Sequence, residues 1–182
     1  MIYLGGRASR EGWVSFETDP LLRRTKEGLH ENCLPCLTGL LEQLRAGAER
    51  VDLGPAWECW KVVALTPTRE DALGLLERFS QAHPDEEVRG KVGGGRDDRP
   101  TWAVIFHTRS EARRDRLLEL VRDLSRRRPP DIPTFCSRGC GIPYEELLGP
   151  WQGWEPVSPI RHPERRARVV ASLRESLYGA AR

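Results

Sequence analysis

The 182-residue sequence contains no apolar run that approaches the ~20 residues of a membrane-spanning helix, so a membrane span is excluded. Residues 1–7 also lack the basic start, the long apolar stretch and the small-residue cleavage site of a secretory signal. These two absences predict a cytoplasmic protein that does not act at a membrane.

The sequence also lacks the short motifs of common catalytic and nucleotide-binding sites. It has no Ser-His-Asp spacing, no H-E-x-x-H, no GxGxxG after a strand and no EF-hand loop. Gly93, Gly94 and Gly95 are not followed by the Gly-Lys-Ser/Thr of a P-loop, and we interpret them as part of a hairpin turn. Whether the protein is an enzyme is therefore left open.

A strong excess of one charge is missing as well. The 29 basic and 27 acidic side chains give a net charge of +2, far below that of a dedicated nucleic-acid binder. Charge is nevertheless uneven, because residues 161–182 hold six arginines against two glutamates. This stretch and a run of three arginines predict a surface for RNA or another anionic ligand, the alternative being solvated helix ends. The candidate residues are Arg126, Arg127, Arg128, Arg165, Arg166 and Arg168.

Cysteine is scarce but conspicuously spaced. Four of the five cysteines form two close pairs about 100 positions apart, a spacing typical of thiolates that bind one metal ion. In a reducing cytoplasm such pairs are more often metal ligands or redox thiols than disulfides. We therefore predict a tetrahedral zinc site with Zn–S distances of ~2.3 Å, with an iron–sulfur cluster as the less favoured cofactor. The predicted ligands are Cys33, Cys36, Cys136 and Cys140, with Cys59 as a spare thiol and His30 left out.

Two alternatives to a metal site follow from the same residues. The cysteines could be unmetallated buried thiols or a disulfide. They could also form a redox centre, because a CxxC motif at a helix N-terminus has its thiolate stabilised by the helix dipole. The polar residues 25–32 do not resemble the buried strand that precedes a thioredoxin-like motif, which weighs against this second alternative.

Hydrophobic periodicity predicts an α+β protein. Alternating and helical patterns after residue 57 give the order β-α-β-β-α-β, which suits a ferredoxin-like core over residues 57–136. The predicted strands cover 59–65, 88–92, 101–107 and 133–136, and the predicted helices begin after the caps Thr68 and Ser110.

Helical extensions are expected on both sides of this core. The extension 1–56 carries the CxxC motif at the start of a helix with Asn32 as its N-cap and a stripe of leucines at 37, 40, 41 and 44. The extension 137–182 ends in a basic amphipathic helix that begins at Pro163, preceded by an irregular Pro- and Trp-rich segment. The metal site would join the two extensions to the core.

The composition of one predicted strand indicates that both faces of the sheet are covered. The strand 101–107 is apolar on both faces, so the sheet face opposite the core helices must be covered by an extension or by a second copy in a homodimer. The sequence as a whole predicts a metal-stapled binding or regulatory module for an anionic partner such as RNA or a phosphorylated ligand. The alternative is a small metal- or thiol-dependent redox enzyme that uses the cysteine cluster.

Overall fold

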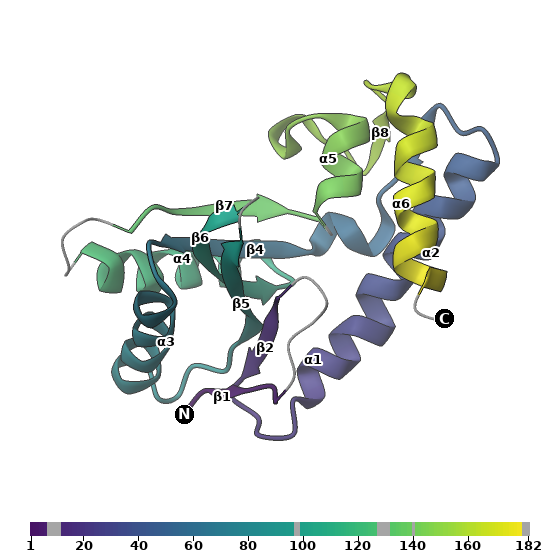
Figure 1. Ribbon diagram of the computed structural model, residues 1–182. Helices are drawn as coiled ribbons and strands as arrows, with labels where there is room; N and C mark the ends of the chain where they lie inside the picture. The colour runs from purple at the N-terminus through teal and green to yellow at the C-terminus, as the bar shows by residue number, and fades with distance from the viewer. Residues whose placement is uncertain (7–11, 97–98, 127–131, 140, 180–182) are drawn as a thin grey trace. The chain divides into compact units, whose positions relative to one another are not determined.

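The chain folds into two compact units, each made of two separate stretches of sequence. The computed structural model describes residues 1–6, 12–96, 99–126, 132–139 and 141–179 (Figure 1). Unit 1 comprises Met1–Lys26 and Trp60–Ser137, and unit 2 comprises Glu27–Cys59 and Arg138–Arg182. No helix within the described ranges is long and apolar enough to cross a membrane.

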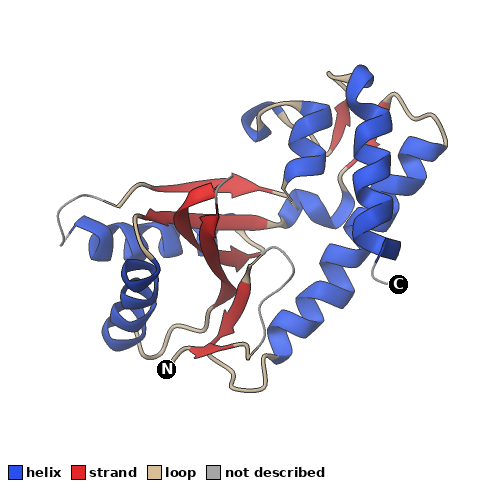
Figure 2. Cartoon of the chain, in the orientation of Figure 1, coloured by secondary structure: helices blue, strands red, loops and turns tan. Residues whose placement is uncertain are grey.

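Unit 1 is built on an antiparallel sheet, which confirms the predicted α+β class (Figure 2). Its six strands lie in the order β1-β2-β5-β6-β4-β7. Their bounds are Tyr3–Leu4 (β1), Val14–Glu17 (β2), Arg89–Arg96 (β5), Arg99–Thr108 (β6), Trp60–Thr66 (β4) and Thr134–Arg138 (β7). The helices α3 (Arg69–Ala82) and α4 (Glu111–Arg126) follow β4 and β6 along the chain. The four predicted strands and two predicted helices of the core are all present.

The core of unit 1 lies between one face of this sheet and the helices α3 and α4. Val62 pairs with Phe106 across β4 and β6, and both side chains are fully buried. The ring of Phe106 lies 5.2 Å from that of Phe16 and 5.0 Å from that of Phe79 of α3. Thr68 caps α3 by accepting a hydrogen bond of 3.1 Å from the backbone N–H of Asp71, as its position predicts.

Gly93–Gly95 lie in strand β5, so their predicted place in the turn is wrong, although β5 and β6 do pair as an antiparallel hairpin. β5 continues to Arg96, and residues 97–98 lie outside the described residues. The glycines occur here because neighbouring groups pack onto the backbone. A Cβ on Gly90 would lie 2.0 Å from the Ile105 carbonyl oxygen, and one on Gly93 would lie 2.8 Å from the Trp13 ring.

Unit 2 is mainly helical. Its elements are the end of α1 (Arg23–Gly28), the π-helical η1 (Leu29–Cys33), α2 (Leu34–Arg45), β3 (Arg50–Asp52), η2 (Gly54–Glu58), α5 (Ile142–Leu148), η3 (Trp151–Gly153), β8 (Val157–Pro159), η4 (Pro163–Arg165) and α6 (Arg166–Tyr178). The strands β3 and β8 form a small antiparallel sheet. The segment predicted to be irregular therefore contains a helix, α5, because Tyr144, Leu147 and Leu148 form a buried face.

The core of unit 2 joins α2 to α5 and α6. The predicted leucine stripe is confirmed, since Leu40, Leu41 and Leu44 are at most 3% exposed. Val169 and Leu173 of α6 belong to the same buried cluster. The core of unit 2 is therefore formed jointly by the C-terminal stretch and by the leucine stripe of α2.

Candidate cysteine site and arginine clusters

The CxxC motif lies inside a continuous helical stretch of unit 2. Cys33 is the last residue of η1 and has helical backbone angles (φ −67°, ψ −45°). The N–H of Leu34 already donates to the Leu29 carbonyl, so α2 does not start with an open N-terminus at this position. The predicted N-cap at Asn32 is therefore wrong, because η1 extends the helix backwards. Cys33 therefore does not lie at the open helix N-terminus that the redox alternative assumed.

Cys36 is buried, whereas Cys33 is half-buried. The side chain of Cys36 is 4% exposed and belongs to the core of unit 2. Its carbonyl oxygen accepts a hydrogen bond of 3.1 Å from the hydroxyl of Tyr144, which lies in α5. This bond ties the CxxC helix to the chain just after Cys140.

Cys59 directly follows η2 as its C-cap and belongs to unit 2 as well. Its N–H donates to the Ala56 carbonyl at 3.2 Å, and its own carbonyl accepts a hydrogen bond of 2.7 Å from the N–H of Gly139. The helix η2 packs against both η1 and α2, which carry Cys33 and Cys36. The elements that carry these three cysteines are therefore neighbours.

Cys140 lies outside the described residues, but both of its neighbours are described. Gly139 and Gly141 have φ angles of 80° and 85°. Arg138, one position further back, donates to the Trp57 carbonyl at 2.6 Å and stacks its guanidinium 3.6 Å from the centre of the Trp57 ring. Gly141 precedes the first residue of α5. The chain on the N-terminal side of Cys140 is thus held on η2, and the chain on its C-terminal side leads into the helix that bonds Cys36.

Cys136 belongs to unit 1. It lies in β7 two positions after Thr134, whose hydroxyl is 3.2 Å from that of Ser125 in α4. Arg114 of α4 interacts electrostatically with Cys136. The pKa of Arg114 is raised, mainly by its hydrogen bond to Asp115 and further by the negative charges of Asp115 and Glu111. The four predicted ligands are therefore divided between the two units.

The described residues by themselves contain no complete metal centre. Within the described ranges, no three His, Cys, Asp or Glu side chains form a group that could hold a metal ion. No disulfide joins Cys33, Cys36, Cys59 and Cys136.

The arginines of the C-terminal helix have acceptors within unit 2. Arg165 donates to the Glu146 carbonyl at 3.5 Å, and Arg168 forms a 2.9 Å ion pair with the Glu146 carboxylate. Arg166 donates to the carbonyl of Ala48. These three side chains therefore connect α6 to α5 and to the turn before β3.

The predicted arginine run at the end of α4 is only partly described. Arg126 is exposed at the last residue of α4, and Arg127 and Arg128 lie outside the described residues. Unit 1 contains 20 basic and 16 acidic side chains, whereas unit 2 contains 9 and 11. Unit 1, which contains residues 126–128, therefore carries the surplus of positive charge. Unit 2 carries none, although its C-terminal helix is rich in arginine.

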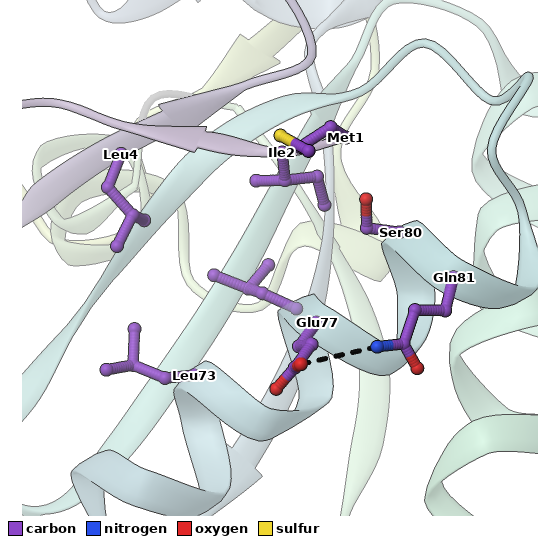
Figure 3. A pocket seen from close by; sticks show the side chains of 8 residues that line it. Met1, Ile2, Leu4, Leu73, Glu77, Ser80 and Gln81 are labelled. Carbon is purple, nitrogen blue, oxygen red and sulfur yellow. Dashed lines mark hydrogen bonds between the residues drawn. The ribbon is translucent and has the colours of Figure 1, made fainter.

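An apolar hollow that the sequence analysis missed lies between β1 and α3 (Figure 3). Its volume is about 380 Å³. Its polar lining residues include Glu77 and Gln81, which hydrogen-bond to each other at 3.2 Å. The first four residues carry no periodic pattern, so no sequence signal pointed to this site. The full lining is Met1, Ile2, Leu4, Leu73, Leu76, Glu77, Ser80 and Gln81.

Comparison with known proteins found no family model, no curated protein and no solved structure that matches this chain. The geometry of the two units is therefore the basis for any functional conclusion.

Proposed function

We propose that this protein is a binding or regulatory module for an anionic partner such as RNA or a phosphorylated ligand, stabilised by a four-cysteine zinc site. The observation that carries the zinc site is the hydrogen bond from Tyr144 to the Cys36 carbonyl, since it links the CxxC helix to the chain next to Cys140. Cys33, Cys36 and Cys140 would be three ligands, and sequence spacing names Cys136 as the fourth. A reducing cytoplasm, the proposed location, keeps such thiols available for metal.

A site with four thiolate ligands fits a structural role. Zinc prefers tetrahedral sulfur ligands, and four protein ligands leave no coordination position for a substrate. The burial of Cys36 and the helical backbone before Cys33 support this role over a redox centre, because a reactive thiol needs exposure and an electropositive environment.

The distribution of charge supports an anionic partner for unit 1. Among the described residues, Arg126 has no ion-pair partner, and two further arginines follow it in sequence. Arg165, Arg166 and Arg168 have acceptors within unit 2, which makes the 126–128 run the stronger candidate contact. Guanidinium groups form strong charge-assisted hydrogen bonds with phosphate oxygens.

We also propose that β4, α3, β5, β6, α4 and β7 form a ferredoxin-like core. The sheet order β5-β6-β4-β7 and the antiparallel pairing of β4 with β6 and of β5 with β6 support this assignment. A fold of this kind hosts many functions and does not by itself select one.

Metal analysis of the full chain, purified without added metal, tests the zinc site. We expect about one zinc ion per chain and four thiols that react only after a chelator is added. Metal-free protein with five freely titrating thiols would contradict the proposal, and iron with matching sulfide would replace zinc by a cluster.

RNA binding by the intact chain tests the anionic partner. A labelled single-stranded RNA should bind more weakly as salt rises, and R126A/R127A/R128A should lower the salt slope by roughly 2, since each phosphate contact contributes about 0.7. The variant R165A/R168A removes two arginines that are paired within unit 2 and serves as the control. No binding at low salt, or equal losses in both variants, would count against the assigned surface.

A further inference from the structure

We infer that the open face of the sheet in unit 1, the face opposite α3 and α4, binds single-stranded RNA. The inference rests on the proposed function, because it takes an anionic partner as its starting point and names the ligand class and the surface. Phe135, Lys61 and Lys91 carry this contact. It is separate from the arginine run at the end of α4.

The sheet of unit 1 has an open face because α3 and α4 cover the same side of it. Val62 and Phe106 belong to the core on that side. Side chains alternate along a strand, so Lys61 and Val63 point to the other side. Within the described part of unit 1, the remaining helical residues are only 23–26, the start of α1.

The register of the strands forms a row of side chains across the open face. Backbone hydrogen bonds at both ends of β7 join it antiparallel to β4, so Phe135 lies opposite Val63. Val63 pairs with Ile105 of β6, which pairs in turn with Lys91 of β5. The row therefore runs from an aromatic ring through two aliphatic side chains to a cation.

Phe135 offers an exposed aromatic ring at one end of this row. The hydroxyl of its neighbour Thr134 lies 3.2 Å from that of Ser125 in α4, so Thr134 faces the helices. Phe135 faces the other way by strand alternation, and 44% of its surface is exposed. Unpaired bases stack on aromatic side chains in this way, whereas the bases of a duplex are already stacked.

Two lysines provide positive charge beside the ring. Lys91 ends the row, and its ammonium lies 4.4 Å from the centre of the Trp13 ring. Lys61 precedes Val63 by two positions and pairs with His107 across β4 and β6. Within the described ranges, Lys61 forms no ion pair. An ammonium at such a position can contact the phosphates of a strand whose base lies on the sheet.

Negative charge is nearly missing from the sheet. Its strands contain one carboxylate, Glu17, which is fully buried. Glu17 accepts hydrogen bonds of 3.0 Å and 2.8 Å from the N–H groups of Arg24 and Thr25, so it does not face a ligand. The lysines and arginines of the strands are Lys61, Arg89, Lys91, Arg96, Arg99 and Arg138. The charge of the strands is therefore complementary to phosphate.

A second copy of the chain is a poorer match for this face. In a symmetric dimer the same patch meets itself, so the lysines at 61 and 91 of both copies would approach each other. No carboxylate of the strands is available to compensate them, and like charges brought together at an interface are costly. Single-stranded RNA supplies phosphates for the lysines and a base for Phe135.

Binding of a short fluorescein-labelled single-stranded RNA to the full chain, followed by anisotropy, tests the inference. F135A and F135L should each weaken binding by roughly 10-fold, because one stacked base is lost, and F135W should retain it. K61A/K91A should lower the salt slope by about 1.4, since each phosphate contact contributes about 0.7, whereas F135A should leave the slope unchanged. The control K26A/R69A removes two exposed cations of unit 1 outside the sheet and should bind as the wild type does.

Cross-linking of the wild-type protein avoids any loss of folding in the variants. Ultraviolet irradiation with a thiouridine-labelled RNA, followed by peptide mass mapping, should place a cross-link in the β7 peptide that contains Phe135. Cross-links confined to α4, or equal binding by K61A/K91A, F135A and the control, would overturn the inference and leave the arginine run as the contact.

Two further outcomes would also overturn it. A dimer in analytical ultracentrifugation that F135A dissociates would show that a second copy occupies the face. No RNA binding by the wild type at low salt would remove the inference together with the proposed function.

Discussion

The backbone N–H of Gly139 donates a hydrogen bond of 2.7 Å to the carbonyl oxygen of Cys59. The bond joins the two stretches of sequence that make unit 2. Because Gly139 combines a φ of 80° with the close approach of Trp154, its conformation and its surroundings both exclude a side chain. The bond therefore depends on glycine at this position.

G139A should destabilise the protein by about 1–3 kcal/mol, because a non-glycine residue with positive φ is strained and its Cβ meets the Trp154 ring. Urea unfolding followed by tryptophan fluorescence measures the loss. G39A is the control, since nothing lies within 4 Å of an added Cβ there and φ is not positive. Gly39 lies within α2, where alanine is the better helix former, so G39A should stabilise by ~0.5–1 kcal/mol. Equal effects of the two variants would contradict the assigned role of Gly139.

Y144F should cost about 1–2 kcal/mol, because it removes the donor to the Cys36 carbonyl while leaving that buried acceptor in place. Tyr144 is 1% exposed, so water does not readily replace the hydroxyl. Y178F is the matched control, since Tyr178 is 57% exposed and its substitution should be close to neutral. If the zinc site exists, Y144F should also release zinc to a chelator faster than Y178F does.

Zinc removal should loosen unit 2 more than unit 1. A metal that binds only the folded state adds RT ln(1 + [L]/Kd) to stability, about 4 kcal/mol at a free metal concentration of 1,000 Kd. Hydrogen exchange after chelation should therefore accelerate in η1, α2 and α5, and the amides of β4, β5 and β6 should change little. Exchange rates that do not change on chelation in either unit would count against the zinc site.

The carboxyl of Asp115 should titrate below its ordinary range, because the hydrogen bond from Arg114 and its positive charge lower the pKa of that group. A carboxyl with a lowered pKa in the folded state stabilises folding above the pKa of the unfolded chain. That contribution is lost as the pH falls through the lower folded pKa. NMR titration measures the shift. R114A should return the pKa of Asp115 toward its ordinary value, and R114K should leave a smaller shift, because lysine lacks the guanidinium fork.

Helical stripes were the part of the fold that sequence predicted best. The leucines of α2 and the apolar residues of α6 recur at helical spacing, which places them on one face of each helix. These faces are the ones that the structure buries. The N-cap role of Thr68 could also be predicted from sequence, because an N-cap residue bonds to backbone groups only a few residues away. Such local signals need no knowledge of distant contacts.

Other features depended on contacts that no local pattern records. The glycines at 93–95 resemble a turn by composition, and only the packing of Trp13 on Gly93 explains why they lie in a strand. The helical turn before Cys33 contains no strong capping signal, so the start of that helix was placed too late. Cys59 has no cysteine neighbour in sequence, and its relation to Gly139 exists only in the folded chain. In sequence, the arginines of the C-terminal helix have no visible partners and therefore suggest a binding surface. Their carbonyl and carboxylate acceptors belong to elements that are distant in sequence and become neighbours only in the folded chain.

The interleaving of the two units has a consequence for synthesis on the ribosome. Unit 2 begins at Glu27 and continues only after Arg138, so Leu40, Leu41 and Leu44 leave the ribosome long before their partners Leu147, Val169 and Leu173 are translated. The leucine face of α2 must therefore stay unpaired while almost all of unit 1 is made. The second core can close only after α5 and α6 have been translated, so its two halves meet late although its first half is made early.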